Sequence, residues 1–110
     1  ITPRSDPHKK PEIVAPAKSV AVINKEGTWS LSDGTSAATV YVTGAIALLL
    51  QNNPELAANG TQDDIANINQ VKEWIQQSSL PRPSQTGHDD NYGYGLLQIK
   101  ALIDAANPDE

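Results

Sequence analysis

The chain contains no cysteine and no phenylalanine, and its basic residues are outnumbered by its acidic ones. The absence of cysteine excludes disulfides, cysteine-based zinc sites and thiol nucleophiles. Eight Lys and Arg against 13 Asp and Glu give a formal net charge of -5 over 110 residues. Because this balance leaves no basic surface for phosphates, we expect no nucleic-acid partner. A hydrophobic content of 38% is still high enough for one folded, soluble domain.

A stretch without any charged residue runs from Gly34 to Pro54. Its apolar part extends only from Ala37 to Leu50 and is interrupted by threonine, tyrosine and glycine. That length and polarity do not fit a membrane span, so we expect no membrane partner. The stretch instead predicts a buried helix over Thr35–Asn52 that stops before the proline.

The rest of the chain divides into an arm, a folded part and a tail. Proline and charge at 1–9 predict an irregular arm, and residues 107–110 are expected to form a tail. The folded part is expected over 10–106. Because Ile1 opens the chain without the charged and apolar regions of a secretory leader, we interpret the sequence as a piece of a longer protein.

Short strands are predicted at 12–17, 19–23 and 28–31, where apolar and β-branched residues gather between turn residues. After a loop at 79–95, paired apolar residues predict a helix over 96–106.

A further helix is expected to follow Thr61. This threonine and the acidic residue three positions later fit a reciprocal capping box. An apolar stripe then repeats at helical spacing and predicts an amphipathic surface helix. The stripe consists of Ile65, Ile68, Val71 and Ile75.

The segment with the most chemical information reads Asp-Gly-Thr-Ser and spans Asp33 to Ser36. Ser36 stands between a glycine turn and a helix start, where unpaired amides and the helix dipole favour developing negative charge. Its own N–H could serve an oxyanion, and Gly34 would allow a substrate backbone to approach closely. Taken by themselves, these residues fit a nucleophile or a simple helix cap.

This segment resembles the serine block of the subtilisin-like serine proteases, which reads Gly-Thr-Ser, any residue, Ser or Ala, any residue, Pro, two residues, a small residue and Gly. Gly34 to Gly44 fit this pattern at every defined position except Val40, where the family has proline. Lys10–Ala17 resembles a second block of the family, with Ala17 in place of its usual glycine. Asn91–Leu97 resembles the closing Gly-x-Gly block. The three blocks occur in the family's order.

The resemblance implies an α/β architecture: the C-terminal part of a subtilisin-like fold, with a mostly parallel sheet flanked by helices. Few strands and about three helices would belong to this chain. It also implies a parent serine endopeptidase that hydrolyses peptide bonds through an acyl-enzyme on Ser36. Gly34 and Thr35 would bind the substrate, and no cofactor would take part in the chemistry. No metal-binding residue is assigned.

The same resemblance implies that a catalytic His, an Asp and an oxyanion amide come from upstream blocks, which this chain does not contain. The chain alone should therefore be inactive. Its implied partners are a protein or peptide substrate and the missing N-terminal part of the catalytic domain. Members of this family are commonly secreted, so the resemblance implies an extracellular location.

Two alternatives remain open at this stage. Val40 suits a catalytically inactive subtilisin-like module for interaction or assembly, because the family's proline is lost at that position. A sedolisin-type serine peptidase, with an acidic residue as its base, would also retain the serine.

The two histidines receive no catalytic role, because neither His8 nor His88 lies in the setting of the family's general base. Both are expected at the surface. The run from His88 to Asn91 offers imidazole and oxygen ligands, but four adjacent residues cannot all converge on one ion. We therefore expect a solvated loop there.

Overall fold

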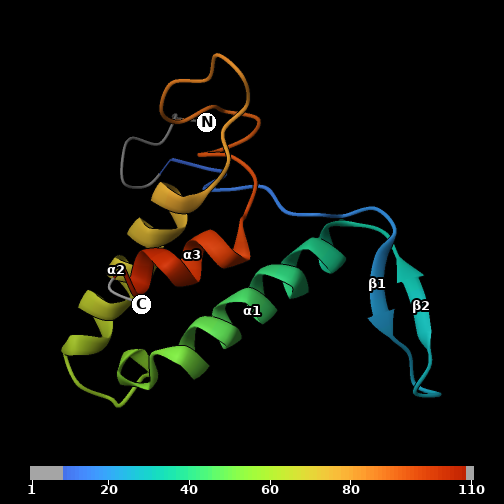
Figure 1. The fold of residues 1–110 in the computed structure, drawn as a ribbon, viewed down its shortest axis with the longest axis horizontal. Helices are drawn as coiled ribbons and strands as arrows, with labels where there is room; N and C mark the ends of the chain where they lie inside the picture. Colours follow the sequence, from blue (N-terminus) through green and yellow to red (C-terminus); the bar gives the residue numbers. More distant parts are fainter. Residues whose placement is uncertain (1–8, 109–110) are drawn as a thin grey trace.

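The computed structural model describes residues 9–108, so His8 and most of the expected arm lie outside the described residues. Within that range the structure contains three α-helices, one short 3-10 helix and one two-stranded sheet (Figure 1). In chain order, the elements are β1 (Val20–Ile23), β2 (Trp29–Ser32), α1 (Thr35–Asn52), η1 (Pro54–Leu56), α2 (Asp63–Ser78) and α3 (Ile99–Ala106).

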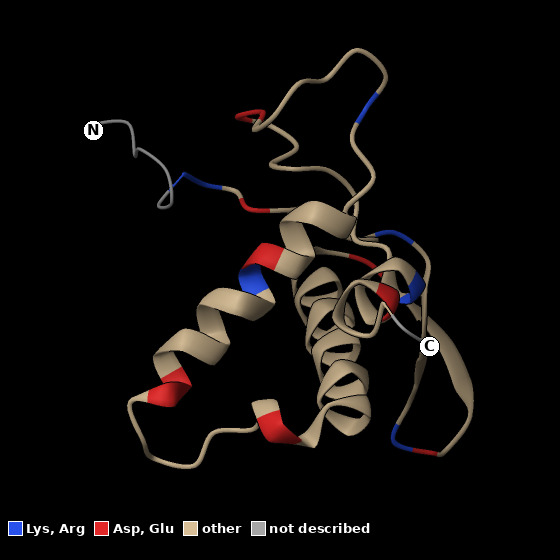
Figure 2. Cartoon of the chain, turned by 60° about the vertical axis from the view of Figure 1, so that its left-hand side comes forward, with Lys and Arg blue, Asp and Glu red and all other residues tan. Residues whose placement is uncertain are grey.

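Helix α1 has the bounds that its uncharged sequence predicts. Two of its threonines satisfy their hydroxyls on the helix itself: Thr39 donates to the Thr35 carbonyl at 2.9 Å and Thr43 to the Thr39 carbonyl at 3.0 Å. The helix ends where the Asn53 N–H donates to the Leu49 carbonyl at 2.8 Å, directly before Pro54. Figure 2 shows no charged residue on α1, whereas α2 carries charges of both signs.

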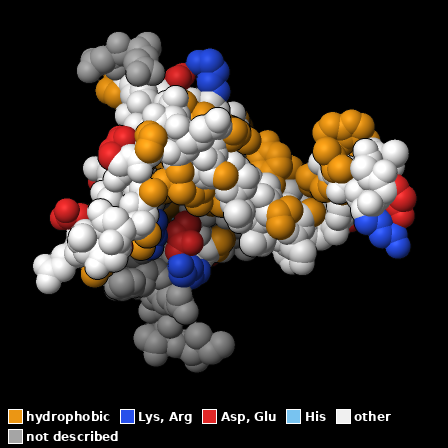
Figure 3. Space-filling model, turned by 90° about the horizontal axis from the view of Figure 1, so that it is seen from below, with side chains coloured by type: hydrophobic (Ala, Val, Ile, Leu, Met, Phe, Trp, Pro, Cys, Tyr) orange, Lys and Arg blue, Asp and Glu red, His pale blue; other side chains and the backbone are white. Residues whose placement is uncertain are grey.

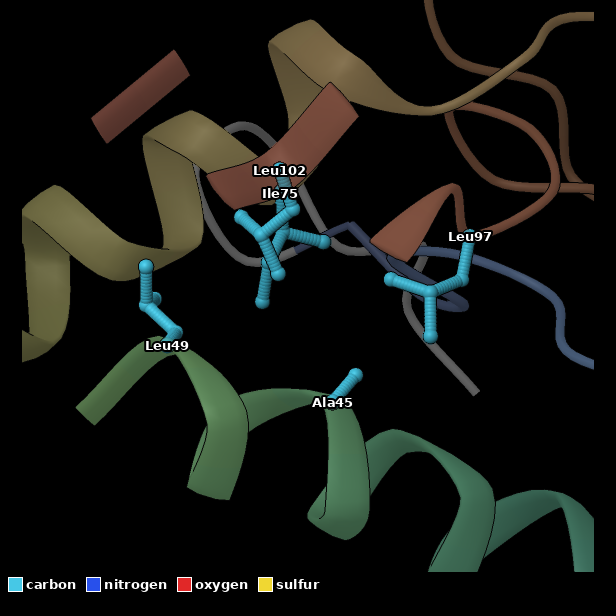
Figure 4. Packing of buried hydrophobic residues seen from close by; sticks show 5 residues of the cluster. All are labelled: Ala45, Leu49, Ile75, Leu97 and Leu102. Atoms are coloured by element: carbon cyan, nitrogen blue, oxygen red, sulfur yellow. The ribbon is translucent and has the colours of Figure 1, made fainter. Parts of the chain in front are cut away.

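The hydrophobic core lies where α1 faces α2, α3 and the segment that precedes α3 (Figure 4). Leu49 of α1 and Leu102 of α3 are fully buried. The other members of the buried cluster are Ala45, Ile75 and Leu97. Such a small cluster limits how much apolar area the chain removes from water.

The apolar stripe of α2 is covered over only half of its length. Ile75 is buried in the core and Val71 packs against it, but Ile65 and Ile68 are 68% and 60% exposed. The predicted helix is therefore present, while the apolar residues of its N-terminal half remain mostly exposed. The apolar spacing did not reveal this difference, because periodicity reports a face and not what lies against it.

The predicted capping box at Thr61 is wrong. The structure has no side-chain cap on α2, and the Thr61 hydroxyl donates backwards to Asn59 Oδ1 at 2.7 Å. Asp64 also acts on the preceding loop, because its carboxylate accepts from the N–H groups of Asn59 and Gly60 at 3.0 and 2.8 Å. Both side chains stabilise the loop instead of the helix end.

Two predicted elements near the core are shorter than expected, because their backbones are used in long-range pairing. The segment 12–17 contributes only an isolated parallel bridge from Val14 to Leu96. Leu96 is also bridged to Leu80, with both N–H···O distances at 2.8 Å, and the Leu97 N–H donates to Val14 at 2.9 Å. Backbone groups in these pairs cannot also enter a helix, so α3 starts at Ile99 and not at 96.

The strands predicted at 19–23 and 28–31 are present as β1 and β2, but their pairing is antiparallel. Val20 lies opposite Ser32 and Ile23 opposite Trp29. The mostly parallel sheet expected for the chain is therefore not found in the described residues. The reason is the connection: a short turn around Asn24 joins the strands, and a parallel pair needs a longer crossover.

The chain exposes more surface than a compact protein of its size. Its accessible area is 7843 Å², against about 5,900 Å² for a compact 11.7 kDa monomer. Hydrophobic side chains gather on the projecting β1–β2 hairpin and across the middle of the face in Figure 3. The hairpin exposes Ile23, Trp29 and Leu31. Within the described residues, no helix combines the length and apolar character needed to cross a membrane.

Candidate active site

Ser36 is the second residue of α1 and is exposed. The first N–H groups of a helix have no partner within it, and they carry the positive end of the helix dipole. Among the described residues, no hydrogen bond engages the hydroxyl or the N–H of Ser36. The serine therefore offers an accessible hydroxyl beside an unused amide donor.

The turn before this serine depends on the conformation of Gly34. Its φ of 118° and ψ of 171° lie in a region that L side chains rarely adopt. A Cβ at this position would meet nothing within 4 Å, so the requirement for glycine is conformational and not one of space. The Gly34 N–H donates to the Ala17 carbonyl at 2.7 Å, which fixes the turn to the segment before β1.

Thr35 opens α1 and is exposed, like its neighbours on both sides. It also lines a mostly apolar hollow of about 330 Å³ between the helix and the segment 13–17. The structure thus brings Gly34, Thr35 and Ser36 together at one accessible helix start. Val40 follows one turn later with 59% of its surface exposed, inside a continuous helix.

His88 is not the surface residue that the sequence predicts, because its side chain is only 3% exposed. Its Nε2 lies 2.8 Å from the Pro11 carbonyl oxygen, and its ring meets Tyr94 edge-on at 5.4 Å. The His88 side chain is buried because it packs against a segment that is distant in the sequence. The sequence of the loop alone does not show this contact. The His88 ring therefore connects the loop 79–95 to the start of the folded part. It does not contact Ser36.

The acidic run after His88 is used in the loop itself. The Asp89 carboxylate accepts from the N–H groups of Asn91 and Tyr92 at 2.8 and 3.0 Å. His88 Nδ1 lies 3.8 Å from Asp90. In the part of the chain that the structure describes, no group of three or more His, Cys, Asp or Glu side chains comes together to hold a metal.

The family resemblance of the sequence blocks is confirmed by comparison with known families, since the model of the subtilase family matches residues 2–95. This range includes the serine block, the block at Lys10–Ala17 and the first five residues of the closing block, Asn91 to Gly95. The chain belongs to the subtilase family. Within this subtilase chain, Val40 and Ala17 depart from the family pattern, whereas the Gly-Thr-Ser of residues 34–36 is retained.

Solved structures confirm a partial subtilisin-like fold. The protease CspB of Clostridium perfringens matches with a TM-score of 0.71 and 21% identity, over 98% of this chain and 22% of that one. The patellamide maturation protease PatA matches with a TM-score of 0.60 and 24% identity, over 89% of this chain and 34% of that one. The subtilase chain thus spans about a fifth and a third of these two proteins.

One contact at this site could not be predicted from the sequence. Asp33, directly before the Gly-Thr-Ser segment, accepts a hydrogen bond from the Ser19 N–H at 2.6 Å. The only sequence signal was an acidic residue next to a predicted turn. Its partner lies fourteen residues away, so the contact depends on how β1 and β2 pair.

Proposed function

We propose that the chain is the nucleophile-bearing part of a subtilisin-like serine endopeptidase, with Ser36 as the nucleophile. The observation that carries this proposal is the exposed Ser36 with its unengaged N–H at the start of α1, in a chain of the subtilase family. Gly34 and Thr35 lie directly before it and are proposed to face the substrate chain. The substrate is a protein or peptide.

In the proposed reaction, a general base takes the proton of the Ser36 hydroxyl while its oxygen attacks the carbonyl carbon of a peptide bond. The oxyanion that forms is stabilised by the Ser36 N–H and the positive end of α1. The amine then leaves with a proton from the base, and water hydrolyses the acyl-enzyme. The base, its orienting carboxylate and a second oxyanion donor come from the rest of the catalytic domain, so this chain alone is inactive. No metal or cofactor takes part.

A second candidate is an inactive subtilisin-like module used in interaction or assembly. Val40 favours it, because the loss of the family's proline leaves α1 regular one turn after Ser36. The exposed apolar residues of the hairpin and α2 suit either candidate, since the rest of a catalytic domain or an assembly partner could cover them.

Labelling with a fluorophosphonate probe tests the proposal in the full-length parent protein. Ser36 should carry the label, and Ser36→Ala should abolish labelling and lower kcat by at least about 10³-fold without a comparable change in substrate binding. Ser30→Ala, which alters a serine of β2, is the matched control and should keep both activities. Labelling that survives Ser36→Ala would overturn the proposal, and a folded parent with neither labelling nor turnover would favour the inactive module.

A further inference from the structure

The turn that carries the proposed nucleophile is fastened to the segment before β1 by two hydrogen bonds. Ser19 N–H donates to the Asp33 carboxylate at 2.6 Å, and Gly34 N–H donates to the Ala17 carbonyl at 2.7 Å. One bond uses the backbone alone, while the other depends on a side chain. Asp33 is therefore the residue through which a substitution can loosen this turn without removing backbone groups.

Ser19, on one side of this contact, has a backbone conformation that needs support. Its φ of 54° lies in the left-handed region that non-glycine residues rarely adopt, whereas the φ of 118° at Gly34 is open to glycine without strain. A conformation such as that of Ser19 persists only where the surrounding structure determines it. The Asp33 carboxylate supplies a short, charge-assisted hydrogen bond at the Ser19 amide.

We infer that Asp33 is a positioning residue for Ser36, an inference that rests on the proposed function. Only two residues separate Asp33 from Ser36, and one of them is the conformationally permissive Gly34. If the hydrogen bond from Ser19 to the carboxylate is lost, only one hydrogen bond holds the turn to the segment before β1. The position of the first turn of α1, which contains Ser36, is then less well fixed. Since a nucleophile displaced by a fraction of an ångström reacts far more slowly, the effect falls on the chemical step.

The alternative role for Asp33 is electrostatic, because a carboxylate next to a helix N-terminus also interacts with the helix dipole and with nearby charge. Two substitutions separate the roles. Asp33→Asn keeps an acceptor oxygen at the same distance from the backbone and removes the charge. Asp33→Glu keeps the charge and moves the carboxylate by one methylene group. Positioning predicts that Asn preserves function better than Glu, and electrostatics predicts the reverse order.

The kinetic experiment measures kcat and KM of the full-length parent and its variants on a peptide substrate, at temperatures where circular dichroism shows each one folded. Asp33→Asn should keep kcat within about threefold, whereas Asp33→Glu and Asp33→Ala should lower it by about 10- to 100-fold with KM within about twofold. Asp104→Asn removes a different exposed carboxylate, which accepts from Lys100 at 2.7 Å on α3, and should leave kcat unchanged. A kcat for Asp33→Glu equal to or above that of Asp33→Asn would overturn the inference.

A second measurement does not depend on activity. Amide hydrogen exchange at Ser19 and Gly34, whose N–H groups form the two hydrogen bonds that hold the turn, should be at least about tenfold faster in Asp33→Glu than in Asp33→Asn. Equal exchange in the two variants would overturn the inference even if Ser36 is the nucleophile. Conversely, if the wild-type parent shows no labelling of Ser36, the proposed function fails, and the exchange rates alone still report whether Asp33 holds the turn.

Discussion

The side-chain amides of Asn53 and Asn107 donate to each other's oxygens, both at 3.0 Å. Asn53 follows α1 and is buried, and Asn107 follows α3. The pair therefore joins the ends of two helices that are 54 residues apart in the sequence. Asn107 Nδ2 also donates to the Ile103 carbonyl at 2.8 Å, so both N–H bonds of its side chain are hydrogen-bonded.

Asn107→Ala should lower the free energy of unfolding by about 1–3 kcal/mol, because it leaves the buried amide of Asn53 without its main partner. Urea denaturation of the chain measures this loss. Asn69→Ala, at an exposed position on α2, is the control and should stay within about 0.5 kcal/mol of wild type. An equal effect of the two substitutions would show that the amide pair adds nothing to stability.

Gly93→Ala should be far more damaging than Gly87→Ala, although both glycines have a positive φ, 61° and 66°. A Cβ on Gly93 would overlap the carbonyl of Glu12, while one on Gly87 would meet nothing within 4 Å. We expect a loss above about 3 kcal/mol for Gly93→Ala and about 1–2 kcal/mol for Gly87→Ala. Thermal unfolding of both variants checks the order, and similar midpoints would contradict the tight contact between the loop and residue 12.

Val40→Pro tests whether α1 tolerates the residue that the subtilase pattern has at this position. Val40 is the sixth residue of a continuous helix, where proline removes a helical hydrogen bond and costs about 3 kcal/mol. We expect a clear drop in the unfolding midpoint, whereas Val40→Ala should change little at this exposed position. An unfolding midpoint unchanged by proline would show instead that α1 accommodates proline at this position, as the family does. A changed peptidase rate in the parent would then reflect a change in the position of Ser36.

The isolated chain should self-associate through its exposed apolar side chains. Trp29 and Leu31 are 73% and 70% exposed on the hairpin, and both strands of this sheet have a free edge within the described residues. Replacing both residues by threonine should reduce the apparent mass in light scattering and the binding of an apolar dye. Gln62→Thr is a neutral control at an exposed site. A monodisperse wild-type monomer would contradict this prediction.

The sequence alone determined those features that depend on neighbouring residues. The bounds of α1 followed from an uncharged run that ends before Pro54, and the turn at Gly34 followed from a residue that tolerates positive φ. The order of three short blocks was sufficient to identify the family, because each block records a local geometry in its own residues.

Only the tertiary structure decided which distant segments meet. The sequence predicts a helical Leu96, but this residue is extended and bridged to both Val14 and Leu80. The sequence also predicts His88 at the surface, but its side chain is buried against Pro11. The bond from Ser19 to Asp33 exists because β1 and β2 pair in one register. Packing determines which groups hydrogen-bond to these backbone amides and carbonyls and which contact a buried ring. Those partners are distant in the sequence, and local propensity and periodicity predict only features of neighbouring residues.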